Sequence, residues 1–528
     1  MDQSTSKNAV GARETVSPRM TALDALRGLA ILMMTLSGSI PFDKPLPDWM
    51  YHAQEPPPTH DFNPNLPGLT WVDLVFPIFL FCMGAAIPIS LSRRIEKGGS
   101  AWKIAGSALI RGATLAWFAV FLQHIRPYAI NPHPTTQTWL ISLYGFALLF
   151  LMFVRIPVKF PKLLRLGLPG AGYLGAIILL LNLRYPAGSY SKFFTPDRND
   201  IILIVLANMA FFGTLIWLVT RKNQLSRLAV LPLYLALRLS ATQPGWVKVL
   251  WKFTPMVGDD KPLAFLFNWD WLKYLFIVIP GTIAGDMLVK WLSETKEEIK
   301  GVGETPVEKR YDWHLSAFSG MSICFIIACL VLVLLIGLEG RHIWQTTLIA
   351  FGMLAPLSFL TNLSLLRANI RSKTPPAEAA SEAQIFQNIS PDLKLIENFV
   401  RWAVYWLLLG LLFEPFEGGI KKDSSTLSYY FVTTAISLLL LTAFFVMTRA
   451  LTSSKILNLF AAVGQNPMIG YCAMGNLIQP ILALTLLDDV FANWTQAPWA
   501  GVFRAVCETL TMGALVALCT RLKLFWRT

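Results

Sequence analysis

Long apolar runs recur along almost the whole of this 528-residue sequence, and they constrain its fold more than any other feature. Most runs cover about 18–25 residues, the length that an α-helix needs to cross the hydrocarbon core of a bilayer. Strands of a membrane β-barrel would be about ten residues long and alternate in polarity, and the sequence lacks that pattern. We therefore predict an all-α polytopic transmembrane helical bundle of about 10–14 helices.

Fourteen segments carry this signal, and the seventh of them is short enough to be re-entrant. Their approximate ranges are 22–41, 72–92, 103–123, 137–154, 166–183, 200–220, 227–240, 271–293, 314–338, 344–366, 398–413, 427–448, 458–486 and 501–521.

The charge of the chain fits a membrane protein. Its 45 Lys and Arg exceed its 32 Asp and Glu, for a formal net charge of +13, yet only 15% of the residues are charged. In multi-pass membrane proteins an excess of basic residues gathers in the cytoplasmic loops and sets the orientation. The basic clusters fall in alternate loops, which predicts both termini in the cytoplasm and residues 42–70 outside. The lipid bilayer is the expected partner, and nucleic acid is not.

The domain organisation is simple. Residues 1–21 are polar, and we expect a disordered cytoplasmic N-terminus. A single transmembrane domain then spans 22–522, with cytoplasmic loops at 293–313 and 367–396 that are too short to fold independently. The six cysteines lie in apolar runs without metal-ligand spacing, so no metal site is expected.

The loop after the first helix holds the first candidate site. Residues 49–77 read "WMYHAQEPPPTHDFNPNLPGLTWVDLVFP" and contain His52 and His60. Both could be solvated loop side chains, but three consecutive prolines restrict the backbone and could hold an imidazole in place. Asp73 either completes a capping box with Thr70 at the next helix or orients one of the histidines.

Cations near the cytoplasmic helix ends form a second group. In "RMTALDALRGLAIL", Asp24 and Arg27 are three residues apart, so they share one helix face. They form an ion pair at the helix end, or Arg27 faces an anionic ligand. Arg93, Arg94 and Arg111 are further cations expected on that side.

The C-terminal third adds polar residues beside apolar runs. Lys421 and Lys422 precede the helix at 427–448, where they either snorkel to the interface or bind a ligand. Asn466 lies in "AAVGQNPMIGYCAMGNLIQP". A buried Asn must be hydrogen-bonded, so it either bridges helices or contacts a ligand.

Five stretches of the sequence match motifs of a known family and occur in the same order as in that family. They read "LDALRGLAI", "GLTWVDLVFPIFLFCMGAAIPISL", "KKDSSTLSYYFVTT", "VGQNPMIGY" and "LKLFW". The chain resembles the heparan-α-glucosaminide N-acetyltransferase family and its bacterial relatives from Arg19 to Trp526, with a poorly matched middle. The family's Gln-Arg pair before the fourth helix is missing, because the chain reads "TWLISLYGF" there.

The resemblance implies a multi-pass enzyme, here of a bacterial inner membrane. It would move an acetyl group from cytoplasmic acetyl-CoA to the amine of a glucosamine-type sugar on the periplasmic side. The family's active histidine lies in the first outer loop: His52 carries the "HA" signature, but His60 lies closer to Gly68, and we favour His60. A base with a histidine's pKa suits transfer to an amine, and a histidine could instead carry the acetyl group itself.

The donor's phosphates would meet cations, and the candidate donor-binding residues are Arg27, Arg93, Arg94, Arg111, Lys421, Lys422 and Asn466. Two rival functions stay open: a permease for sugars or envelope fragments without enzymatic activity, and an O-acyltransferase acting on an envelope glycan. A requirement for acetyl-CoA separates the permease from both enzymes. A homodimer also stays open.

Overall fold

The computed structural model describes residues 20–156, 161–186, 193–252, 264–301, 317–371, 391–450 and 454–527. The predicted disordered terminus falls outside these ranges apart from residues 20 and 21, and Thr21 already belongs to the first helix. The predicted loops at 293–313 and 367–396 are only partly within them.

Helices follow one another along the described chain. The first half contains α1 (Thr21–Ser39), η1 (Asp48–Met50), η2 (Val72–Leu74), α2 (Val75–Glu96), α3 (Ala101–His124), α4 (Pro127–Ile130), α5 (Thr136–Phe153), α6 (Lys162–Asn182), α7 (Ile201–Thr220), α8 (Gln224–Ser240), α9 (Trp246–Lys252), η3 (Ala264–Leu266) and η4 (Trp269–Tyr274). The second half contains α10 (Leu275–Gly301), α11 (Ala317–Glu339), α12 (Ile343–Arg371), α14 (Pro391–Phe416), α15 (Leu427–Ala450), α16 (Lys455–Gly464), α17 (Pro467–Ala473), the π-helical η5 (Met474–Ile478), α18 (Gln479–Leu484), α19 (Leu487–Trp494) and α20 (Pro498–Arg521).

The predicted all-α bundle is confirmed. Within the described ranges, 12 helices are long and apolar enough to cross a membrane. Large apolar side chains such as Trp102, Phe325 and Phe503 are exposed on the outside of the bundle, as expected for a surface that faces lipid. The short predicted helix at 227–240 forms α8 and is not one of these candidate spans.

One predicted helix is wrong in detail. The range 458–486 was expected to be continuous, but α16 ends at Gly464 and α17 begins at Pro467. Proline lacks a backbone N–H and fits the first turn of a helix, so it starts a new helix here. A π-helical turn, η5, interrupts the same run again before α18.

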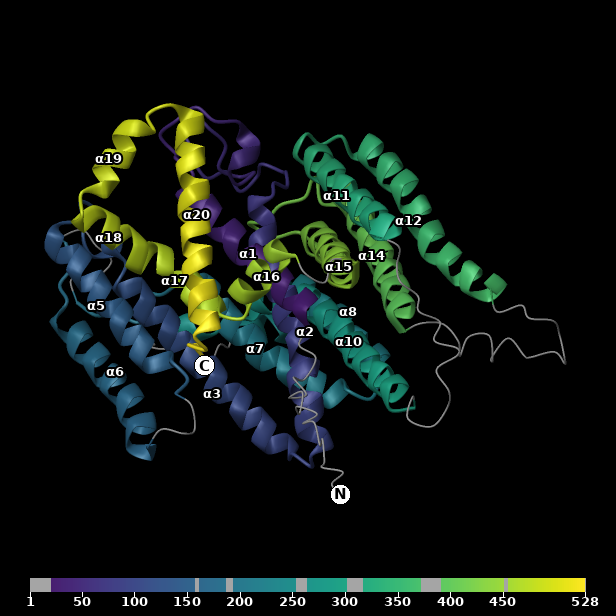
Figure 1. Ribbon diagram of the computed structural model, residues 1–528, viewed down its shortest axis with the longest axis horizontal. Helices are drawn as coiled ribbons and strands as arrows, with labels where there is room; N and C mark the ends of the chain where they lie inside the picture. Colours follow the sequence, from purple (N-terminus) through teal and green to yellow (C-terminus); the bar gives the residue numbers. More distant parts are fainter. Residues whose placement is uncertain are drawn as a thin grey trace, which may run out of the picture.

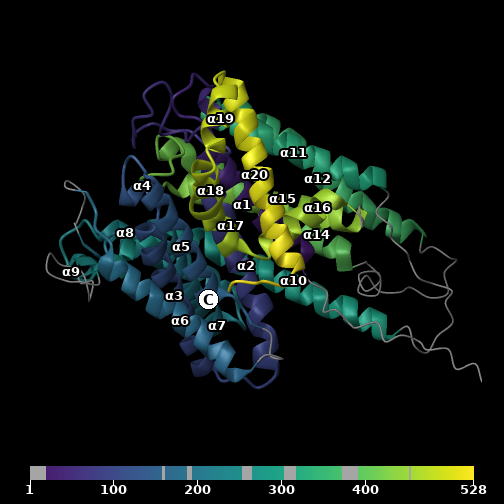
Figure 2. The same cartoon turned by 60° about the vertical axis from the view of Figure 1, so that its left-hand side comes forward.

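The most extensive helix pairs are α14 with α15 and α10 with α2, and α1 lies in the middle of the bundle, against α2, α15 and α16 (Figures 1 and 2). Glycines allow the closest of these approaches. A Cβ at Gly84 would collide with the backbone of Val278 on α10, and one at Gly281 would collide with Phe81 on α2. The two helices therefore touch backbone to backbone, which fixes α2 firmly in the bundle.

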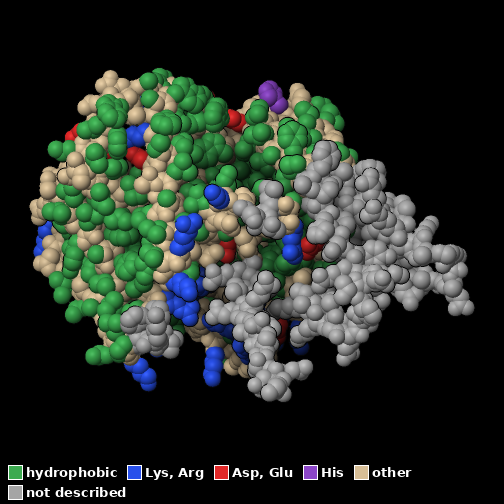
Figure 3. All heavy atoms as spheres, in the orientation of Figure 1, with side chains coloured by type: hydrophobic (Ala, Val, Ile, Leu, Met, Phe, Trp, Pro, Cys, Tyr) green, Lys and Arg blue, Asp and Glu red, His purple; other side chains and the backbone are tan. Residues whose placement is uncertain are grey.

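The two ends of the bundle differ. The segment of residues 40–70 and α19 lie together at the top of Figure 1, and the junction of α2 and α3 lies at the bottom. Figure 3 shows Lys and Arg side chains gathered over the lower part of the visible face. We call the two ends the loop end (residues 40–70 and α19) and the basic end (the start of α1 and the end of α2). That the basic end is cytoplasmic remains a prediction from the charge pattern.

Candidate active site

At the loop end, His52 lies against the start of α2. Its Nδ1 is 2.7 Å from Oδ1 of Asp73. The Asp73 side chain is 2% exposed and that of His52 is 30% exposed. The pair therefore combines a buried carboxylate with an imidazole that solvent or a ligand can reach.

Backbone groups hold the Asp73 carboxylate in place. The N–H groups of Ala53 and Thr70 donate to its Oδ2 at 3.2 and 3.1 Å. The Tyr429 hydroxyl on α15 donates to the Asp73 carbonyl at 3.0 Å. The predicted capping box is not formed, because the residues before η2 and α2 are Trp71 and Leu74 and no side chain caps either helix. Asp73 accepts from the Thr70 N–H, while the Thr70 hydroxyl donates to the Tyr51 carbonyl. The alternative prediction, contact with a histidine, is the one that the structure shows.

This contact sets the state of the imidazole. An ionised carboxylate only accepts hydrogen bonds, so the proton of neutral His52 lies on Nδ1 and Nε2 keeps its lone pair. A buried carboxylate behind a partly exposed imidazole is the arrangement of a positioned base or nucleophile.

Lys422 completes this group from the loop between α14 and α15. Its Nζ lies 3.1 Å from Nδ1 and 3.4 Å from Nε2 of His52, and 4.0 Å from Oδ1 of Asp73. Lys421 lies in the same turn, where its N–H donates to the Thr426 hydroxyl. Both lysines were candidates for donor binding. The structure places the turn that carries them against the His52 loop, and neither lysine lines the cavity that contains the candidate arginines.

His60 is placed differently from His52. Its Nδ1 lies 3.2 Å from the Glu55 carbonyl, and its ring packs edge-on against Tyr51 and Phe42, at centroid distances of 4.4 and 4.9 Å. Burial, together with the charge of Asp43, raises the pKa of Tyr51, so its hydroxyl stays a donor to the Pro41 carbonyl. The structure brings His52 rather than His60 to Asp73, so we transfer the expected catalytic role to His52.

At the basic end, a cavity of about 800 Å³ opens between α1, α2, α3, α7, α17 and the C-terminal tail. Six arginines line it, against a single aspartate, Asp24. These are Arg27, Arg93, Arg94, Arg111, Arg155 and Arg527. The cavity therefore contains every arginine that the sequence predicted for donor binding, and two more.

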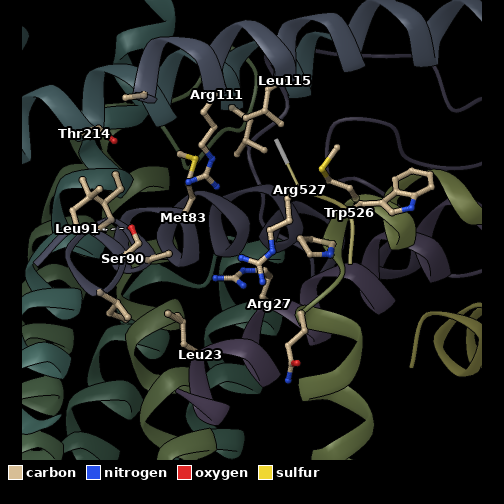
Figure 4. Close-up of a pocket in the computed structure, with 18 of the residues that line it drawn as sticks. Leu23, Arg27, Met83, Ser90, Leu91, Arg111, Leu115, Thr214, Trp526 and Arg527 are labelled. Atoms are coloured by element: carbon tan, nitrogen blue, oxygen red, sulfur yellow. Dashed lines mark hydrogen bonds between the residues drawn. The ribbon is translucent and has the colours of Figure 1, made fainter. Parts of the chain in front are cut away.

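The arginine side chains converge. Figure 4 shows Arg27, Arg111 and Arg527 pointing into one space from three different elements. Arg27 is 3.2 Å from Asp24 and donates to the Gly464 carbonyl at 3.2 Å, so the predicted ion pair exists and Arg27 also faces the cavity. Arg27, Arg94 and Arg527 act on Arg111 as like charges. Such a concentration of positive charge favours an anionic ligand.

The C-terminal tail forms one wall of this cavity. The Arg155 N–H donates to the Phe525 carbonyl at 2.8 Å, and the Arg527 N–H donates to the Phe153 carbonyl at 2.9 Å. The only β-pairing in the described ranges is the isolated bridge between Val154 and Trp526 at this point. Arg155 and Arg527 were missed as site residues, although both lie in segments whose basic character placed them on the cytoplasmic side.

Asn466 joins the start of α17 to the C-terminal segment and does not line the cavity. Its Nδ2 donates to the Thr520 hydroxyl and the Leu524 carbonyl, each at 3.0 Å, and its Oδ1 accepts from the Trp526 N–H at 3.2 Å. The prediction that Asn466 bridges helices is therefore confirmed. Its neighbour Gln465, and not Asn466, lines the cavity. Asn466 acts by holding the tail that carries Arg527.

Away from the arginines the cavity is apolar. Phe79, Met83, Leu115, Phe118 and Leu206 line its interior. A ligand that combines an anionic head with a less polar arm matches this division. Among the described residues, no group of three or more His, Cys, Asp or Glu could hold a metal ion.

Helix α2 connects the two sites. Asp73 lies in η2 just before it, and Arg94 lies in its last turn. At about 1.5 Å of rise per residue, the two are separated by roughly 30 Å along the helix axis. That distance is about the thickness of the hydrocarbon core. Phe79, the cavity residue on α2 closest to Asp73, is only about 9 Å from it on the same scale.

The fold and these two sites define a multi-pass integral membrane protein with a histidine–carboxylate pair at one end and an arginine-lined cavity at the other. The chain belongs to the family described as a domain of unknown function (DUF5009), whose profile matches residues 19–288, just over half of the chain. No curated protein matches the sequence. The matched range includes His52, Asp73 and five of the cavity arginines, whereas Lys422 and Arg527 lie beyond it.

Proposed function

We propose that this protein is a membrane acyltransferase. It takes an acetyl group from acetyl-CoA in the cytoplasm and transfers it to the amine of a glucosamine-type sugar on the opposite, periplasmic side of a bacterial inner membrane. The observation that carries the proposal is the pairing of an arginine-lined cavity with a buried-carboxylate histidine at the far end of the same helix. The sequence resemblance to heparan-α-glucosaminide N-acetyltransferases supports the choice of donor and acceptor.

The cavity has the features that a CoA thioester requires. The phosphates of CoA would bind to the arginines at the basic end, since guanidinium groups form paired hydrogen bonds with phosphate oxygens. The less polar pantetheine arm would lie along the apolar interior, toward Phe79. This placement directs the thioester toward the loop end, where His52 is located.

His52 supplies the proton chemistry at the loop end. Its Nε2 accepts the proton that the acceptor amine loses as the amine nitrogen attacks the thioester carbon. The C–S bond then breaks, and the proton passes from Nε2 to the departing thiolate. Asp73 holds the ring in this tautomer and stabilises the transient imidazolium. Prior transfer of the acetyl group to Nε2 uses the same two residues.

The test is acetyl transfer by the purified protein in detergent. Acetyl-CoA and glucosamine should yield N-acetylglucosamine and one equivalent of CoA thiol, detected by mass spectrometry and by a thiol reagent. The His52→Ala variant provides the blank. Absence of product with glucosamine, together with ester formation on a hydroxyl sugar, would favour the O-acyltransferase.

A permease gives a different result. It would move a labelled sugar across the proteoliposome membrane without acetyl-CoA. Neither the wild-type protein nor the His52→Ala variant would then consume acetyl-CoA. Sugar flux that is independent of acetyl-CoA, with no acetylated product, would replace the proposed function.

A further inference from the structure

We infer that Lys422 is a catalytic residue that stabilises the negative charge developing on the acyl oxygen during transfer at His52. For the natural substrates, this inference rests on the proposed function. The position of Lys422 beside His52 would act in the same way on any carbonyl group that His52 Nε2 attacks. The ammonium group lies beside both nitrogens of an imidazole that is 30% exposed.

The hydrogen-bonding pattern leaves Lys422 with donors to spare. An ammonium group has three N–H donors. His52 Nδ1 lies 3.1 Å from Nζ but directs its own proton to Asp73, so it is not an acceptor for Lys422. The distance of 4.0 Å to Asp73 Oδ1 is too long for a hydrogen bond. Among the contacts of the described residues, only Nε2 at 3.4 Å remains as an acceptor, so donors are available for a ligand oxygen.

The surrounding contacts hold Lys422 in this position. Gln54, which is 3% exposed, donates to the Asp423 carbonyl and accepts from the Asp423 N–H at 2.9 Å. Glu417 accepts from the N–H groups of Leu427 and Ser428 at 2.6 and 2.8 Å. The turn that carries Lys422 is thereby tied to the His52 loop on one side and to the start of α15 on the other. A donor fixed before the reaction stabilises a developing oxyanion without the cost of reorganisation.

In the transfer step the acceptor amine forms a bond to the acyl carbon, and the carbonyl π electrons move to the oxygen. Lys422 donates a hydrogen bond to that oxyanion and keeps its proton. The oxyanion collapses, the C–S bond breaks, and the thiolate leaves with the proton that His52 Nε2 had taken from the amine.

The alternative role for Lys422 is a structural one, as a counter-charge to the buried Asp73. The two roles predict opposite effects on the intrinsic reactivity of His52. Removing an oxyanion donor slows acylation of Nε2. Removing a mere counter-charge leaves an imidazole that is equally accessible or more so, and acylation proceeds at the same rate or faster.

The experiment measures carbethoxylation of His52 by diethyl pyrocarbonate in the full-length protein in detergent. Nε2 attacks one carbonyl of the reagent, ethyl carbonate leaves and decays to ethanol and CO2, and the Nδ1 proton is lost. Peptide fragmentation by mass spectrometry separates His52 from His60, and exposed His133 serves as the internal rate reference. Lys422→Met should slow the reaction at His52 by roughly 10-fold or more relative to His133, while Lys421→Met should not change it. An unchanged or faster rate in Lys422→Met overturns the inference.

A second variant covers poor folding of Lys422→Met. Lys422→Cys should show the same slow reaction, and alkylation with 2-bromoethylamine, which rebuilds an ammonium side chain, should restore the rate in the same sample. Failure of this rescue also overturns the inference. The acetyl-transfer assay then separates the two claims: kcat should fall roughly 100-fold in Lys422→Met with KM for acetyl-CoA unchanged. A wild-type protein that shows Lys422-dependent carbethoxylation but no acetyl transfer refutes the proposed function and supports the inference.

Discussion

Replacing Asp73 by Asn tests the role of the carboxylate with the smallest change in shape. The amide oxygen can replace Oδ2 and accept from the N–H groups of Thr70 and Ala53. The amide NH2 then faces His52 Nδ1, which must accept instead of donate. The proton of the imidazole moves to Nε2, and the nitrogen that faces the ligand can no longer act as a base or nucleophile.

The expected magnitudes follow from these contacts. The two backbone hydrogen bonds to Oδ2 become bonds to a neutral acceptor, and the bond with His52 becomes one between two neutral groups with its direction reversed. At about 1 kcal/mol for each of these three changes, the variant should lose roughly 3 kcal/mol of stability. Activity should fall far more, on the order of 10⁴-fold, as expected for an imidazole held in the wrong tautomer. Acetyl-CoA binding should change little, because Asp73 does not line the arginine cavity and Arg94 lies roughly 30 Å from it along α2.

The assay compares kcat for acetyl transfer with stabilisation by acetyl-CoA in Asp73→Asn and in Asp61→Asn, an exposed aspartate of the same loop. The control should keep both properties. Full activity in Asp73→Asn would refute the reasoning, and loss of acetyl-CoA binding in parallel with activity would show that the variant is globally disturbed.

Three further predictions concern the histidines, the cavity and the orientation. His52→Ala should abolish acetyl transfer and keep donor binding, whereas His60→Gln should retain most activity; the reverse pattern would return the catalytic role to His60. Arg111→Met should weaken acetyl-CoA binding by about 1.5–3 kcal/mol, because it removes a charged hydrogen bond. Titration calorimetry should show a Kd that is roughly 10- to 150-fold higher, and an unchanged Kd would exclude Arg111 from the donor site. Asp61→Cys and Lys97→Cys should react with an impermeant maleimide from opposite sides of the membrane, and labelling of both from one side would contradict the orientation.

The sequence predicts the fold well, because span length and charge alternation are local properties. Helices such as α1, α3, α7 and α15 begin and end within a few residues of the predicted ranges. The break at Gln465 and Asn466 was hidden by the apolar residues around it. Pro467 was the signal that could have revealed it, since proline favours the first turn of a helix.

The sites were predictable only in part, because their geometry joins distant segments. The arginines share one side of the membrane, so loop charge alone could place them together. Lys422 reaches His52 across a separation of 370 residues, and nothing local to either residue indicates the contact. The choice between His52 and His60 rested on spacing to Gly68. The loop instead folds back so that the more distant histidine meets Asp73.

The central claim is that an acetyl group crosses the membrane between the two ends of this bundle. The most direct measurement uses proteoliposomes with glucosamine trapped inside and acetyl-CoA, which does not cross the bilayer, added outside. Molecules with the basic end outward should produce N-acetylglucosamine in the lumen and CoA thiol outside, in equal amounts. Transfer across the membrane would be contradicted if no N-acetylglucosamine formed in the lumen, or if it formed only when both substrates were in the same compartment.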